Sequence, residues 1–126
     1  MHARILIADD NRDAADTMGM LLELDGHEVM IAHSGNQALK LGRERRPDVI
    51  ILDIGMPDVN GYEVARAARN EDWGKGAYMI ALTGWGQADD KERARMAGFD
   101  RHLTKPVDPD LVEEILKEYL RGKLGR

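Results

Sequence analysis

Short apolar runs alternate with amphipathic segments along the whole chain. Each run is a few residues long, is rich in Ile, Val or Leu, and is continuous rather than alternating with polar residues. Runs of this kind are typical of strands buried on both faces, as in a parallel sheet. The predicted strands cover residues 5–8, 29–32, 49–52 and 79–82, with a weaker fifth at 101–103.

The segments between these runs have helical spacing and clear end signals. Ser34, followed by Gln37, forms a capping-box pattern at the start of a helix that ends before Pro47. Gly26 is suited to end a helix, and Asp108 followed by proline is suited to begin one. The other predicted helices cover residues 14–24, 62–69, 88–97 and a last segment from residue 109.

Strict alternation of strand and helix predicts an α/β fold with a parallel sheet and helices on both faces. Right-handed crossovers leave few topologies for such a chain. The 126 residues, 43% hydrophobic and 33% charged, have the size and balance of one globular domain. We therefore expect a single domain over residues 1–126, without an effector domain.

Charge and cysteine content exclude several classes of protein. The net charge of −5 argues against a nucleic-acid-binding surface, and the absence of cysteine excludes disulfides, thiolate zinc sites and cysteine nucleophiles. No stretch approaches the roughly 18 apolar residues that span a bilayer, and the start lacks a signal peptide. We expect a cytoplasmic domain that makes no membrane contact.

Polar side chains that could bind a ligand or take part in a reaction follow the ends of four predicted strands. They are Asp9, Asp10, Asp53, Thr83 and Lys105. The carboxyl ends of parallel strands meet at one edge of the sheet, which is where such folds bind ligands. Each residue alone has an ordinary explanation as a helix cap, turn former or solvated charge. Their joint placement is what predicts a site.

This set of residues suits phosphoryl transfer. Three neighbouring carboxylates repel one another, and Mg²⁺, which prefers oxygen ligands, would relieve the repulsion. An aspartate can attack phosphorus and form an acyl phosphate. A lysine and a hydroxyl can neutralise or bind the phosphoryl oxygens.

The chain resembles the receiver domain of response regulators from two-component systems over essentially its whole length. The matching stretches are residues 5–11, 50–63, 80–84, 98–100 and 103–106. The resemblance implies a flavodoxin-like (βα)5 three-layer sandwich with a five-stranded parallel sheet in the order 2-1-3-4-5. It implies phosphorelay signalling rather than a stand-alone enzyme.

The resemblance also implies roles for single residues. Asp53 would accept the phosphoryl group, and Asp10, Asp53 and the carbonyl of Gly55 would bind Mg²⁺, with Asp9 helping through water or a hydrogen bond. Lys105 would pair with the phosphoryl group, next to a cis Lys105–Pro106 peptide. Thr83 would bind a phosphoryl oxygen and report it to the face formed by the fourth helix and fifth strand.

Partners follow from the same resemblance. They are a histidine kinase or a histidine phosphotransfer domain, with the chain a monomer or a phosphorylation-dependent dimer. The stretch from 81 to 108 looks most like receivers attached to hybrid histidine kinases, although a stand-alone regulator stays open.

Two positions depart from the usual pattern. His102 stands where many receivers carry the Tyr or Phe of the switch, and it is interpreted either as a switch residue or as a partly exposed sheet-edge residue. Trp85 is expected at the rim of the site, where it would cover the phosphoryl group or belong to an interface.

Three other functions fit these residues less well. A magnesium-dependent phosphatase would carry a second aspartate where Gly55 stands. A flavin-binding module would need a Ser/Thr/Gly-rich phosphate loop after the first strand, where this chain has Asp9, Asp10 and Asp13. An adaptor that has lost phosphorylation is disfavoured because the set of site residues is intact.

Overall fold

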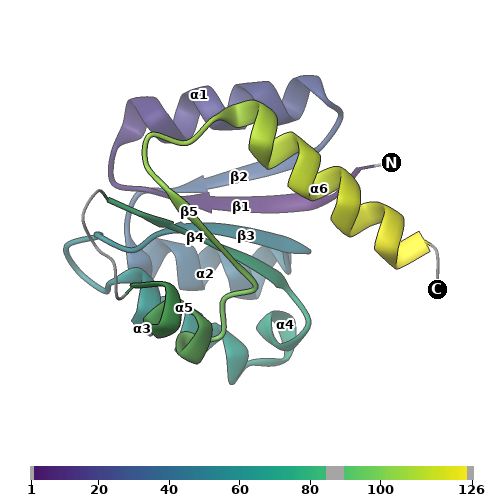
Figure 1. Cartoon of the computed structure of the whole chain (residues 1–126). Helices are drawn as coiled ribbons and strands as arrows, with labels where there is room; N and C mark the ends of the chain where they lie inside the picture. Colours follow the sequence, from purple (N-terminus) through teal and green to yellow (C-terminus); the bar gives the residue numbers. More distant parts are fainter. Residues whose placement is uncertain (1, 85–89, 125–126) are drawn as a thin grey trace.

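A computed structural model describes residues 2–84 and 90–124, and its centre is one parallel sheet (Figure 1). The strand order is β2-β1-β3-β4-β5, as predicted, and every neighbouring pair is parallel. The strands are β1 (Arg4–Ala8), β2 (Glu28–Ala32), β3 (Val49–Asp53), β4 (Tyr78–Thr83) and β5 (Arg101–Thr104). Each of the predicted strands is present, one or two residues longer than the apolar run that marked it.

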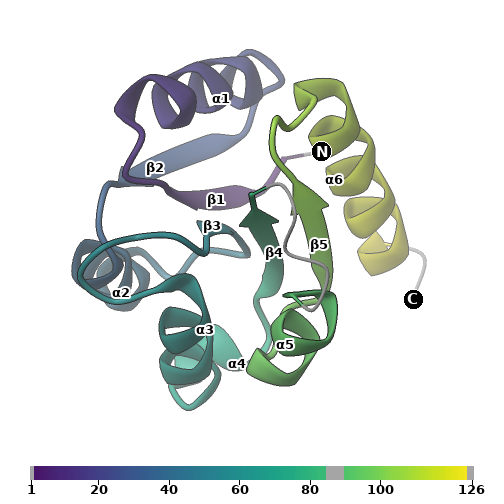
Figure 2. The same ribbon diagram turned by 60° about the vertical axis from the view of Figure 1, so that its left-hand side comes forward.

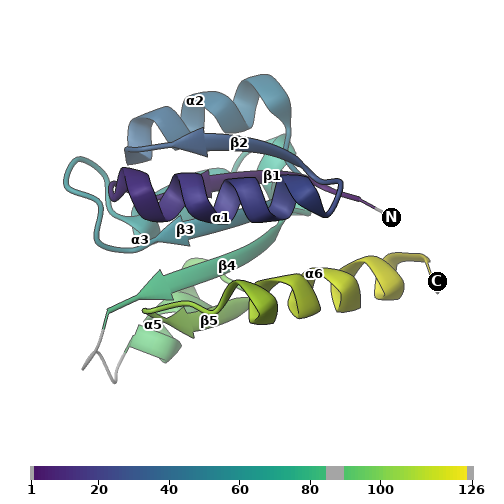
Figure 3. The ribbon, with the colours of Figure 1, turned by 90° about the horizontal axis from the view of Figure 1, so that it is seen from above.

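Helices cover both faces of the sheet, giving three layers (Figures 2 and 3). The helices α1 (Arg12–Leu24) and α6 (Pro109–Leu124) lie on one face. The other face carries α2 (Gly35–Arg45), α3 (Gly61–Arg69), α4 (Asp72–Lys75) and α5 (Asp90–Ala97). None of the described helices is long and apolar enough to cross a membrane.

The core is divided into two halves by the sheet. Along β1, Ile5 and Ile7 pack under α1 and α6, while Leu6 and Ala8 pack under the opposite helices. All five residues of β3 are buried, which explains why its apolar run does not alternate. This double burial fixes the strand that ends at Asp53.

The helix ends agree with most of the sequence signals. Ser34 Oγ accepts from the Gln37 amide at 3.1 Å, but the Gln37 side chain accepts from His33 rather than from Ser34. The reciprocal half of the predicted capping box is therefore displaced by one residue. Asp108 accepts from the Asp110 amide at 2.9 Å and caps α6, as predicted.

Backbone geometry confirms Gly26 as a helix end and shows that Gly98 has the same role. Gly26 and Gly98 follow α1 and α5 with φ of 94° and 108°. These are left-handed conformations that suit glycine at the end of a helix. The helix predicted from residue 88 is described only from Asp90, and Trp85 lies outside the described residues.

The short helix α4 was not predicted. Its Trp73 is buried against α2, where a Cβ on Gly42 would lie 2.3 Å from the indole ring. Glu71 accepts from the Trp73 indole at 3.0 Å and forms a bidentate ion pair with Arg43 of α2 at 2.8 and 3.0 Å. These contacts hold α4 against α2.

Gly42→Ala is expected to destabilise the protein. Alanine normally favours a helix over glycine by about 1 kcal/mol, but its methyl group has no room beside Trp73. Overpacking of this kind costs about 1–3 kcal/mol. Urea unfolding measures the change. Gly122→Ala in α6, where the added carbon meets no described atom within 4 Å beyond its own turn of the helix, is the matched control and should be neutral or stabilising. Equal stability of Gly42→Ala and wild type would contradict this packing.

Candidate functional site

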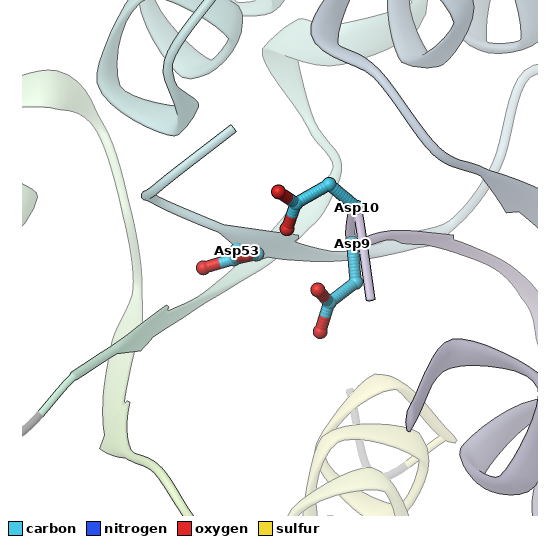
Figure 4. A group of neighbouring side chains, drawn as sticks. All are labelled: Asp9, Asp10 and Asp53. Atoms are coloured by element: carbon cyan, nitrogen blue, oxygen red, sulfur yellow. The ribbon is translucent and has the colours of Figure 1, made fainter. Parts of the chain in front are cut away.

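The predicted acidic residues come together where β1 and β3 end. Asp9 and Asp10 follow β1 directly, and Asp53 is the last residue of the neighbouring strand β3. One carboxylate oxygen from each lies within 4.8 Å of the others, as Figure 4 illustrates. The parallel pairing of the two strands therefore creates the acidic cluster.

Burial makes this cluster electrostatically demanding. Asp9 and Asp53 are only 3% and 5% exposed, whereas Asp10 is exposed. Burial raises the pKa of the Asp9 carboxyl above its usual value, and the negative charge of Asp53 raises this pKa further. A hydrogen bond from the Asn11 amide at 2.9 Å acts in the opposite direction and lowers the pKa of Asp9. Positive charge nearby would therefore favour the ionised form of Asp9.

Lys105 supplies one such charge. Its Nζ lies 3.0 Å from Asp53 Oδ1 and 3.6 Å from Asp9 Oδ2. The Lys105 amide donates to the Thr83 carbonyl at 2.7 Å, and the Lys105–Pro106 peptide is cis, as predicted. The segment after β5 is therefore hydrogen-bonded to the end of β4, with its lysine between two carboxylates.

Gly55 lies in the loop after β3. Its amide donates to Asp53 Oδ1 at 3.1 Å, so this oxygen is contacted by both a backbone N–H and Lys105. The amide of Gly61 donates to the Ile54 carbonyl at 3.0 Å and closes the loop against β3. The loop thereby contributes backbone groups to the site.

Thr83 and His102 are hydrogen-bonded to each other. Thr83 is 2% exposed at the end of β4, and its Oγ1 lies 2.7 Å from His102 Nε2 on β5. Thr83 pairs in register with Thr104, and Ala81 with His102. His102 is partly exposed on the edge strand β5, as one interpretation expected, and it also contacts the threonine of the site.

The donor set fits a hard divalent cation. Three carboxylates provide oxygen ligands, and Lys105 compensates only one of their negative charges. Such a set suits Mg²⁺, which binds through one or two carboxylates and keeps several waters.

Two other residues contact the surroundings of the site and were missed from sequence. His33 Nδ1 lies 3.1 Å from the Asp9 carbonyl, and because a carbonyl can only accept, Nδ1 carries the proton. Asp58 bonds to two amides at the start of α2, at 2.9 and 3.0 Å. Both contacts join residues more than 20 positions apart, and no local pattern signals them.

A cavity of about 680 Å³ opens beside this cluster. It lies between α1 and the segment that follows β5, and its lining includes Asp9, Lys105, Pro106 and Met18. The lining is mostly apolar, so the charged site adjoins a hydrophobic recess.

A five-stranded parallel sheet with acidic residues and a lysine at its carboxyl edge defines a receiver-like α/β protein. Comparison with known families makes the class specific: residues 5–117 match the response regulator receiver domain. The chain belongs to this family, whose members are signalling modules of two-component systems. The phosphatase and flavin-binding alternatives are therefore not supported.

Similar proteins and structures are also receiver domains or response regulators. The polar-differentiation response regulator DivK of Brucella anthropi is 33% identical over 120 residues, covering 95% of this chain and 98% of DivK. The CheY-like receiver domain protein of Methanospirillum hungatei is 30% identical with a TM-score of 0.90, covering 99% of this chain and 98% of that one. The receiver domain of a signal transduction histidine kinase from Syntrophus aciditrophicus is 28% identical with a TM-score of 0.86, covering 95% and 91%.

Mg²⁺ is expected to stabilise the protein, and Asp10→Asn should remove most of that effect. A ligand at 100 times its dissociation constant stabilises by about 2.7 kcal/mol. Thermal unfolding with and without Mg²⁺ measures this. In metal-free buffer Asp10→Asn should be at least as stable as wild type, because one repulsive charge is lost.

Asp16→Asn, an equal charge change at an exposed position of α1, is the control. An undiminished response to Mg²⁺ in Asp10→Asn would contradict the metal site.

Proposed function

We propose that this chain accepts a phosphoryl group on Asp53 from a phosphohistidine of a histidine kinase or a histidine phosphotransfer protein. The observation that carries the proposal is the contact of Asp53 Oδ1 with Lys105 Nζ at 3.0 Å, inside a cluster of three carboxylates. Lysine at this position supplies charge compensation for both the free carboxylate and a phosphoryl group.

In the transfer step, a carboxylate oxygen of Asp53 attacks phosphorus as the bond between phosphorus and the imidazole nitrogen breaks. The electron pair of that bond leaves with the imidazole, and Asp53 becomes an acyl phosphate. Lys105 neutralises charge on the phosphoryl oxygens, and the Gly55 amide, which donates to Asp53 Oδ1, orients the carboxylate. Hydrolysis of the acyl phosphate by water would reset the domain.

The residues that would hold Mg²⁺ are Asp10, Asp53 and the Gly55 carbonyl, with Asp9 acting through water or a hydrogen bond. Bound there, the cation would neutralise negative charge between the carboxylates and the phosphoryl oxygens. Asp9 would also keep Lys105 directed at the site through their 3.6 Å ion pair.

Thr83 is the proposed reader of the phosphoryl group. Its hydroxyl has one proton, so donating to a phosphoryl oxygen leaves only its lone pairs for His102. The 2.7 Å contact with Nε2 would then persist only if His102 donates. Phosphorylation would thereby change the hydrogen bonding of β5. It would also change the face formed by β5 and α5, the helix predicted fourth from the sequence.

Several finer assignments stay predictions. They are the extent of the domain over residues 1–126, attachment to a hybrid histidine kinase, a monomer or phosphorylation-dependent dimer, and a cytoplasmic location. The similarity to a kinase-borne receiver supports the second of these. The apolar cavity beside Lys105 is compatible with an approaching protein partner.

Asp53→Asn is expected to abolish phosphorylation. Wild-type protein incubated with Mg²⁺ and acetyl phosphate should gain the mass of one phosphoryl group, measured on the intact protein, because the carboxylate is the nucleophile. The control Asp72→Asn changes an exposed aspartate of α4 and should be phosphorylated normally. Absence of an adduct in wild type, both with acetyl phosphate and with a phosphorylated kinase, would sink the proposal.

The contact between Thr83 and His102 is expected to appear as a coupling in a double-mutant cycle. Urea unfolding of Thr83→Val, His102→Phe and the double variant should give a coupling of about 1 kcal/mol, the net value of one hydrogen bond. In phosphorylated Thr83→Val, the amide shift changes of β5 should be smaller than in wild type. Additive effects of the two substitutions, together with unchanged β5 shifts, would refute the proposed switch.

A further inference from the structure

We propose that Asp58 is a positioning residue, which fixes the loop between β3 and α3 on the start of α2 and so sets the affinity of the site for Mg²⁺. The inference rests on the proposed function, because the loop carries Gly55, the proposed backbone ligand. Asp58 itself lies outside the cluster of Asp9, Asp10 and Asp53, and its carboxylate bonds to the start of α2.

The first contact is between the Asp58 carboxylate and the first turn of α2. Oδ1 accepts from the Gly35 amide at 2.9 Å, and Oδ2 accepts from the Asn36 amide at 3.0 Å. Ser34 Oγ accepts from the next amide, that of Gln37, at 3.1 Å. The leading amides of α2 are thus divided between a local cap and a carboxylate from a distant loop.

The negative charge of Asp58 is maintained by these bonds. The amides of Asn36, Gly35 and Val59 lower the pKa of the Asp58 carboxyl to about 2. A depressed pKa means that the contribution to stability is present above the unfolded pKa and is lost as the pH falls toward 2. The contact therefore persists at any pH at which the protein is expected to work.

Close backbone packing accompanies the carboxylate contact. A Cβ on Gly35 would lie 2.3 Å from the Val59 carbonyl oxygen and 2.7 Å from Val59 Cβ. At the far end of the loop, a Cβ on Gly61 would lie 2.8 Å from the Asp53 carbonyl oxygen. The loop is therefore held between the start of α2 on one side and the end of β3 on the other.

The segment between these two points has few other polar anchors. Within residues 2–84 and 90–124, no backbone–backbone hydrogen bond involves residues 55–59. The contacts that hold them include the Gly55 amide on Asp53 Oδ1, the burial of Met56, the packing of Val59 against Gly35, and the bonds of Asp58 to α2. Removing the Asp58 bonds should let the Gly55 carbonyl sample positions away from the carboxylates.

The test compares Asp58→Asn with Ser34→Ala in the full chain. Each substitution removes one acceptor for the amides at the start of α2, but only Asp58→Asn is expected to loosen the loop between β3 and α3. Asp58 is exposed, so its variant should fold. Loss of a residue that orients a ligand typically weakens metal binding at least tenfold. Isothermal titration with MgCl₂ should show a dissociation constant about tenfold higher in Asp58→Asn and within about twofold of wild type in Ser34→Ala.

Two further readouts separate positioning from a loss of helix stability. Amide hydrogen exchange at Gly55, whose N–H donates to Asp53 Oδ1, should be faster in Asp58→Asn and unchanged in Ser34→Ala. With acetyl phosphate, Asp58→Asn should need more Mg²⁺ for half-maximal phosphorylation, while its rate at saturating Mg²⁺ stays within about threefold of wild type.

The outcomes are distinguishable. An unchanged dissociation constant in Asp58→Asn, or an equal loss in both variants, would overturn the positioning role. If wild type binds no Mg²⁺ in the titration, the proposed metal site fails instead. In that case hydrogen exchange still decides whether Asp58 anchors the loop, since unchanged exchange would overturn the inference on its own.

Discussion

Repulsion among three neighbouring carboxylates is the constraint around which this molecule is organised. The parallel pairing of β1 with β3 brings Asp9, Asp10 and Asp53 together, and two of them are almost fully buried. Lys105 offsets only part of that charge. The remaining electrostatic free energy is stored in the folded state, and it favours any ligand that brings positive charge to this edge. The proposed affinity for a cation and the proposed phosphoryl transfer would therefore have the same physical origin.

The fold keeps this arrangement rigid because the strands that carry it are buried on both faces. β3 has no exposed residue, and helices cover each side of the sheet. The strand register places Asp53 beside Leu82, and Thr83 is the next residue after Leu82. It also places Thr83 beside Thr104, and Lys105 is the next residue after Thr104. The relative positions of Asp53, Thr83 and Lys105 therefore follow from strand pairing.

Sequence predicted those parts that depend on local pattern. Apolar runs marked the strands because strands buried on both faces have no polar positions, and residues that follow strand ends necessarily gather at one edge. The helix α4 escaped prediction because its four residues are too short for a helical period. The contacts of Asp58 with α2 and of His33 with Asp9 span more than 20 residues, so no neighbouring signal could reveal them. The pairing of His102 with Thr83 needed the register of β5.

The strand order has a further consequence for how such a domain can diversify. β2 and β5 are the two edges of the sheet, with Asp53 between them. The contacts of Asp58 with α2 lie toward the first edge, and those of Thr83 with His102 toward the second. If both proposed roles hold, substitutions near the β2 edge would change the affinity of the site for Mg²⁺, while substitutions near the β5 edge would change how phosphorylation alters the α5–β5 face. On this proposal, sensitivity to the cation and coupling to the output would be separate targets for natural selection within one small sheet.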